Sequence, residues 1–294
     1  MKIIERDEKL KSPGNHILKP EDYVEPRCVL CGDPYGVTPE VKPVPQQRII
    51  QKMDEYMSRR DYEGAGRHLL YWLEEARFGS DLKGQLMICN ELVGYYRKMS
   101  DRENAFIRGE EALRLLSELH MEDSISAGTT YVNLATACNA FQENQRALEL
   151  FYKAKLLYES SGQTRPDLLG GLYNNMALTC AALGRFDEAG DLYEKALSVM
   201  ADVTDGELEQ AITYLNMANA IEYEHGLEEG DEEICTCLDK ALELLDTPTL
   251  PRDGYYAFVC EKCAPTFEYY GYFLAGKELT GRAEEIYSRL SQDR

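Results

Sequence analysis

Residues 173–196 read YNNMALTCAALGRFDEAGDLYEKA, and residues 131–154 read YVNLATACNAFQENQRALELFYKA. The two stretches can be laid on one another with little adjustment, and YLNMANAI at 214–221 begins a third copy. Each copy carries Ala, Leu and aromatic residues at i, i+3 and i+4 spacing, which predicts pairs of amphipathic helices. Self-similarity at a fixed period is the signature of a repeat protein.

The copies resemble the tetratricopeptide repeat. In that family a small residue in the first helix of a pair lets the second helix approach, a turn follows, and the second helix carries further small and aromatic residues. In the 173–196 copy the matching residues are Ala177, Gly184, Phe186, Ala189, Tyr193 and Ala196.

The repeat extends in both directions from these copies. Its second-helix marker recurs at Ala65, Ala105, Ala147, Ala189, Ile234 and Ala283. This period of about 42 residues exceeds the usual value of about 34, and it resembles the longer kinesin light chain type of repeat. The fold predicted for 46–294 is therefore all-α: a solenoid of about six antiparallel helix pairs, wound as a right-handed superhelix.

Residues 1–45 differ in composition from the repeats. They hold seven of the eleven prolines, so they cannot form a run of regular helix. We expect an irregular arm at 1–45, which carries a CxxC motif, followed by the repeat array at 46–294.

Charge and composition exclude several classes of partner. The 294 residues include 52 Asp or Glu against 32 Lys or Arg, a formal charge of -20 that repels nucleic acids and anionic membranes. No stretch is long and apolar enough to span a membrane, and the N-terminus lacks the apolar region of a secretory signal. An odd count of nine cysteines is typical of reduced thiols or metal ligands, so we expect a cytoplasmic protein.

The resemblance implies that first helices line a concave surface and that an asparagine ladder holds the backbone of a bound peptide. An amide side chain can pair both the C=O and the N–H of an extended chain. The candidate peptide-binding residues are Asn133, Asn175 and Asn216, each two places before a small residue, with Asn90, Asn174, Asn219 and Tyr223 at neighbouring positions. The alternative is that these amides are solvated polar residues on an exposed face.

The partner that such a surface would take is a protein or peptide. First helices between 123 and 225 contain no Lys or Arg, which disfavours a reader of terminal carboxylates. They would show Thr136, Leu178, Glu222 and Tyr223, which indicates a neutral or partly basic peptide with apolar anchors. Residues 201–250 carry fourteen acidic residues against only Lys240, either as a solvated loop and helix start or as a docking face for a basic partner.

Two cysteine pairs fit a zinc site. Cys28 and Cys31, followed by Gly32, have the arrangement of a zinc knuckle, and Cys260 and Cys263 lie one helical turn apart. Together they could form a site of four thiolates if the solenoid is strongly curled. The alternatives are unligated thiols, or a site made by Cys28 and Cys31 with a residue such as His16.

The last repeat is rich in aromatic residues: Tyr255, Tyr256, Phe258, Phe267, Tyr269, Tyr270, Tyr272 and Phe273. We expect most of them in the core, while a minority could form a hydroxyl-rimmed binding pocket.

No catalytic motif stands out, since GxGxxG, P-loop, HExxH and GxSxG patterns are missing from the sequence. The sequence therefore predicts a peptide-binding scaffold or adaptor and no enzyme. The alternative function is a zinc-stabilised structural or sensor protein whose arm closes the groove, and an unmarked hydrolase is the third possibility.

Overall fold

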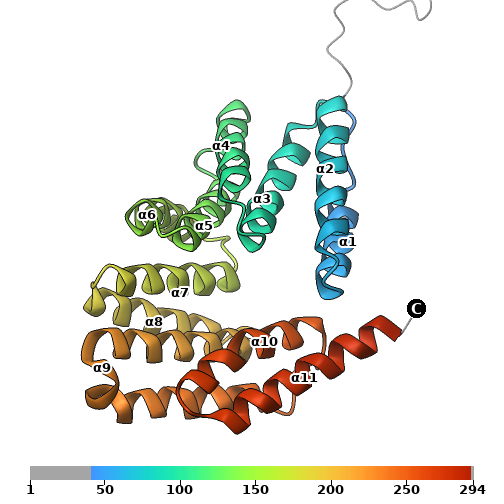
Figure 1. The fold of residues 1–294 in the computed structure, drawn as a ribbon. Coiled ribbons are helices and arrows are strands. Elements are labelled where there is room, and N and C mark those ends of the chain that lie inside the picture. Colours follow the sequence, from blue (N-terminus) through green and yellow to red (C-terminus); the bar gives the residue numbers. More distant parts are fainter. Residues whose placement is uncertain (1–40, 293–294) are drawn as a thin grey trace, which may run out of the picture. The chain divides into compact units, whose positions relative to one another are not determined.

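The computed structural model describes residues 41–292, and the repeat array begins at Lys42 (Figure 1). Within this part the chain forms eleven helices and no strand. The helices are α1 (Gln46–Ser58), α2 (Tyr62–Phe78), α3 (Leu82–Lys98), α4 (Arg102–Glu118), α5 (Ile125–Ala140), α6 (Asn144–Ser160), α7 (Pro166–Ala182), α8 (Phe186–Met200), α9 (Glu207–Leu245), α10 (Gly254–Tyr269) and α11 (Phe273–Gln292).

Helix α9 is two helices joined at a sharp bend. Gly226 has φ 81° and ψ 169°, a conformation that is open to glycine alone, and Gly230 of the second half packs against Ile221 of the first. With the two halves counted separately, the described helices form six consecutive pairs, which confirms the predicted all-α solenoid.

The acidic residues 228–233 belong to the segment for which a solvated loop and helix start was one expectation, and the structure places them at a helix start. They are helical and lie in the first turns after Gly226. Carboxylates there interact favourably with the helix dipole, which explains why so acidic a segment can continue as helix.

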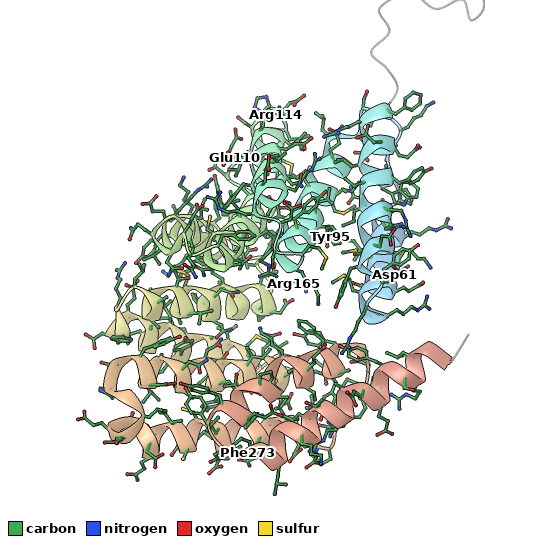
Figure 2. All side chains as sticks on the ribbon, viewed as in Figure 1. Asp61, Tyr95, Glu110, Arg114, Arg165 and Phe273 are labelled. Carbon is green, nitrogen blue, oxygen red and sulfur yellow. The ribbon has the colours of Figure 1, made fainter. Side chains whose placement is uncertain are left out.

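A recurring turn separates the first four helices. Arg60, Ser80 and Ser100 each have positive φ, and an aspartate follows each of them. The side chains of Asp61, Asp81 and Asp101 then accept hydrogen bonds from backbone N–H groups at the start of α2, α3 and α4. Asp61 is labelled in Figure 2. Such capping satisfies N–H groups that the helix itself leaves unpaired, so these turns fix where each helix begins.

Small residues let the helices approach closely. The marker residues Ala177, Ala189 and Ala196 are buried, as is Tyr193, in the core formed by α5 to α8. Gly128 of α5 lies so close to the Tyr158 ring that an added Cβ would overlap it. The predicted repeat pattern therefore describes the packing correctly.

The two ends of the array meet. Helix α1 contacts α10, and Arg60, in the turn after α1, forms an ion pair with Glu261 of α10 at 2.5 Å. Val44 precedes α1 and is also part of the array, since its N–H donates to Asp81 at 2.9 Å and its side chain is buried. Cys28, Cys31 and His16 lie outside the described residues.

Candidate functional site

Several predicted asparagines join neighbouring first helices. Asn90 of α3 donates from Nδ2 to Thr130 Oγ1 of α5 at 3.0 Å, and Asn216 of α9 donates to Asn174 Oδ1 of α7 at 3.1 Å. These three amides therefore hold adjacent repeats together, whatever else they contact.

The prediction did not include Asn139, which makes a contact of the same kind. Its Nδ2 donates to Thr179 Oγ1 at 2.6 Å and so links α5 to α7. The sequence contained a signal for this hydrogen bond. In each hydrogen bond of this kind the two residues are separated by 40 or 42 positions, close to one repeat period.

The remaining predicted residues are placed differently. Asn175 donates to Gly171 O within α7 at 2.8 Å, and Asn219 accepts from the Tyr270 hydroxyl at 3.0 Å. The half-buried side chain of Asn133 has no hydrogen-bond partner within residues 41–292, and Tyr223 is 69% exposed. Peptide binding by the asparagines remains a prediction, and Asn133, Asn175 and Tyr223 are the residues best placed for it.

Tyrosines of the last pair bind carboxylates of α9. Tyr269 and Tyr270 both donate to Glu222, at 2.6 and 2.7 Å, and Tyr255 donates to Glu209. Burial, together with Glu222, raises the pKa of Tyr270. Glu222, which was expected to face a peptide, is therefore engaged with the neighbouring repeat.

A cavity of about 660 Å³ lies where the ends of the array meet, and we call it the closure cavity. Its walls come from α1 and the turn after it, from α2 and α3, and from α10 and α11. Aromatic and apolar side chains on its wall are Met57, Tyr62, Tyr255, Phe258, Tyr287 and Leu290, and charged ones are Asp54, Glu55, Arg60, Lys98 and Glu261. Tyr255 and Phe258 of the last pair thus line a pocket of the described array.

Cations of the first repeats contact aromatic rings across the closure cavity. Lys98 Nζ lies 5.0 Å from the centre of the Tyr62 ring and 5.4 Å from that of Phe258. The Arg60 guanidinium lies 4.8 Å from the centre of the Tyr287 ring. The cavity thus combines aromatic surface with charge, which is typical of sites that recognise cations.

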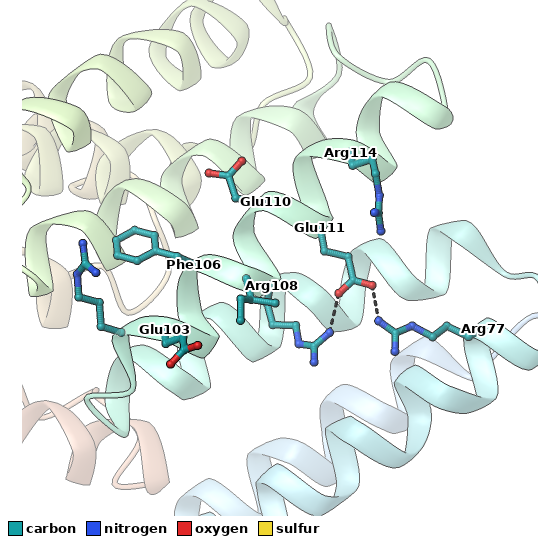
Figure 3. A pocket seen from close by; sticks show the side chains of 9 residues that line it. Arg77, Glu103, Phe106, Arg108, Glu110, Glu111 and Arg114 are labelled. Carbon is teal, nitrogen blue, oxygen red and sulfur yellow. Dashed lines mark hydrogen bonds and ion pairs between the residues drawn. The ribbon is translucent and has the colours of Figure 1, made fainter.

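A second hollow, of about 1040 Å³, lies over the second helices α2 and α4 (Figure 3). Glu111 accepts hydrogen bonds there from Arg77 and, at 2.6 Å, from Arg108. Burial alone would raise the pKa of Glu111, but these two hydrogen bonds outweigh it and lower the pKa. Opposite charges are paired within this hollow, so we assign it to the packing of α2 against α4.

The cysteines of α10 are core residues. Cys260 and Cys263 are buried, and burial raises the pKa of their thiols to about 11 and about 12, so both are protonated at neutral pH. Residues 41–292 contain no group of three or more side chains that could hold a metal ion. A zinc site shared with Cys28 and Cys31 remains a prediction, and it would require α10 to expose thiols that are buried in the array.

The comparisons with known proteins agree with this description. Residues 168–229 match the model of the tetratricopeptide repeat family, which confirms the predicted resemblance. No curated protein matches the chain. No helix among residues 41–292 is long and apolar enough to cross a membrane.

Solved structures of similar arrays include BtubC (BKLC) from P. vanneervenii, which is 19% identical, with 86% of this chain and 94% of that one covered at a TM-score of 0.47. Two crystal structures of nearly identical TPR-like repeats from Podosopora anserina, assigned to a putative kinesin light chain, are each 16% identical to this chain. One is a single-residue variant with a TM-score of 0.49, covering 71% of this chain and 97% of its own, and the other has a TM-score of 0.47, covering 71% and 98%.

Proposed function

We propose that this protein is a non-catalytic scaffold that binds a peptide segment of another protein along its first helices. One observation carries the proposal: neighbouring first helices present a stripe of partly exposed residues at the same repeat positions. Asn133 and Thr136 lie on α5, and Asn175 and Leu178 lie one turn apart on α7. Stacked helix pairs commonly use such continuous surfaces for binding.

The charge of the array favours a partly basic segment. Residues 201–250, which include the whole of α9, carry fourteen acidic residues and one lysine, whereas residues 42–120 carry as many basic as acidic residues. A basic segment would therefore be attracted to the α9 end, and opposite charges of this kind orient partners and speed their association. Nucleic acids and anionic membranes are not proposed as partners, and the cytoplasm is the expected compartment.

A display library of random peptides, selected on the full chain, tests this function. The selected peptide is then titrated into variants by fluorescence anisotropy. Loss of two hydrogen bonds in Asn133→Ala/Asn175→Ala should weaken binding by about ten-fold, with unchanged urea unfolding. Leu156→Ala on the exposed side of α6 is the control and should bind like the wild type. Failure to select any peptide, or equal affinity of the double variant, would contradict the proposal.

A further inference from the structure

We propose that the closure cavity binds a basic side chain, a lysine or arginine of the partner segment. The inference rests on the proposed function and adds to it the position and charge of one anchor. It is carried by the lining of the cavity, in which aromatic surface lies beside a carboxylate that no cation of the described residues neutralises.

The aromatic wall is fixed in position and partly open. The rings of Tyr255 and Phe258 stack with their centres 6.3 Å apart and their planes at 23°, and they are 48% and 39% exposed. The Tyr255 hydroxyl donates to Glu209, which holds the ring in place. Lys98 already lies over Phe258, so this wall accepts a cation within the protein itself.

The carboxylates of the cavity differ in how they are compensated. Glu55 is paired with Lys52 at 2.6 Å, and Glu261 is paired with Arg60 at 2.5 Å. Asp54 has no ion pair within residues 41–292. Asp54, which is exposed, is thus the acidic group on the wall that forms no ion pair with the described residues, and Lys98 is the basic group of which the same holds.

Glu91 of α3 does not line the cavity, but it adds negative charge close to Asp54. Burial raises the pKa of Asp54. The pKa of Glu91 is also raised, mainly by burial and in addition by repulsion from Asp54. In the described part of the chain no cation lies close enough to lower the pKa of either group. An ammonium or guanidinium group placed beside Asp54 would relieve this repulsion and satisfy the carboxylate at the same time.

Other occupants fit less well. An acidic side chain would lie beside Asp54 and be repelled by it, and an apolar one would remove Asp54 from water without giving it a partner. The volume of about 660 Å³ is large enough for a long basic side chain together with the residues that flank it. The cavity therefore selects a cation on a flexible stem whose methylene groups pack against the rings.

The test uses the full chain with ¹³C-labelled methionine methyl groups, because Met57 lines the cavity. N-acetylarginine methylamide is titrated and the Met57 signal is followed by NMR, with N-acetylglutamine methylamide as the uncharged probe. We expect a saturable shift with the arginine probe only. The isosteric variant Asp54→Asn should weaken binding by at least about five-fold, and Tyr255→Leu should weaken it further.

Glu74→Gln is the matched control, since Glu74 lies outside the closure cavity and is paired with Arg77 at 2.7 Å, and it should bind like the wild type. An equal response to both probes, no response of Met57, or unchanged affinity of Asp54→Asn would overturn the inference. Urea unfolding of each variant shows whether it is folded. The library peptide separates the two proposals: if its binding depends on Asn133 and Asn175 but not on Asp54, the scaffold function stands and the cavity site falls.

Discussion

Glu111 is the most heavily paired carboxylate in the hollow over α2 and α4. Its side chain is 10% exposed and accepts from both Arg77 and Arg108 (Figure 3). Glu111→Ala would leave the half-buried Arg108 without an acidic partner, so we expect the free energy of unfolding to fall by about 1–3 kcal/mol. Urea denaturation followed by circular dichroism measures this loss. Glu110→Ala, which removes an exposed pair with Arg146, should cost less than about 1 kcal/mol.

The effect of Glu111→Ala should also depend on pH. The folded protein lowers the pKa of Glu111, so the contribution of this carboxylate to stability is complete above its unfolded pKa, near 4.3. The contribution is lost as the pH falls through the lower pKa of the folded state. Unfolding curves of wild type and variant should therefore differ fully at pH 7 and converge below about pH 4. A difference that stays constant across this range would show that Glu111 acts through packing alone.

For single residues, the sequence predicted which asparagines have a structural role better than it predicted their hydrogen-bond partners. Asn216 was predicted because it recurs in the repeat frame, and Asn90 and Asn174 because they lie at neighbouring first-helix positions. All three form hydrogen bonds between first helices. Whether an amide faces a neighbouring helix or the solvent depends on how each pair is rotated against the next. That rotation is set by packing across the whole pair, so a repeat position alone does not determine it.

Helix pairs approach closely where glycine stands in place of a larger residue. An alanine Cβ at Gly128 would overlap the rigid ring of Tyr158, which is buried. Gly128→Ala should therefore force α5 away from α6 and cost about 1–3 kcal/mol in urea unfolding. Gly190 of α8 has nothing within 4 Å of the same added atom. Gly190→Ala should instead stabilise the protein by about 0.5–1 kcal/mol through helix propensity. If both variants changed the free energy of unfolding in the same direction, the packing argument would be contradicted.

The helix pairs themselves were predictable because their signals are local. One buried marker recurs in each pair, as Ala65, Ala105, Ala147, Ala189, Ile234 and Ala283, and it survives in the weaker terminal repeats. The bend inside α9 is the turn of the fifth helix pair, which the six predicted pairs require. The sequence did not show how short this turn is, because the acidic residues that follow Gly226 usually indicate a loop. Helix continues there since the carboxylates lie at the start of the second half, where the dipole favours them.

The meeting of the two ends is a property of the whole array. The sequence indicates six pairs, but each pair adds a small rotation, and errors in that rotation accumulate over the array. The contact of α1 with α10 therefore could not be derived from the period, although it creates the closure cavity and brings Asp54 near Tyr255. The aromatic residues of the last repeat, Tyr255 among them, indicated a possible pocket, but Asp54 lies outside the repeat frame and no sequence pattern indicated its part in the site.

The closure is held by contacts that are individually weak. In the Arg60–Glu261 pair both side chains are nearly half exposed, a situation in which an ion pair contributes about 0–1 kcal/mol. The cation contact of Lys98 with Phe258 adds a contribution of similar size, and the cavity leaves much of the interface unpacked. The ends should therefore separate before any helix pair unfolds.

Arg60→Ala/Lys98→Ala tests this order of events. We expect small-angle X-ray scattering to give a larger radius of gyration for the double variant than for the wild type, because both cross-closure cations are gone. The free energy of unfolding should change by less than about 2 kcal/mol, since the helix pairs keep their cores. Arg67→Ala breaks an exposed ion pair with Glu63 inside α2 and should leave the scattering unchanged. A double variant as compact as the wild type would show that apolar contacts between α1 and α10 close the array without these cations.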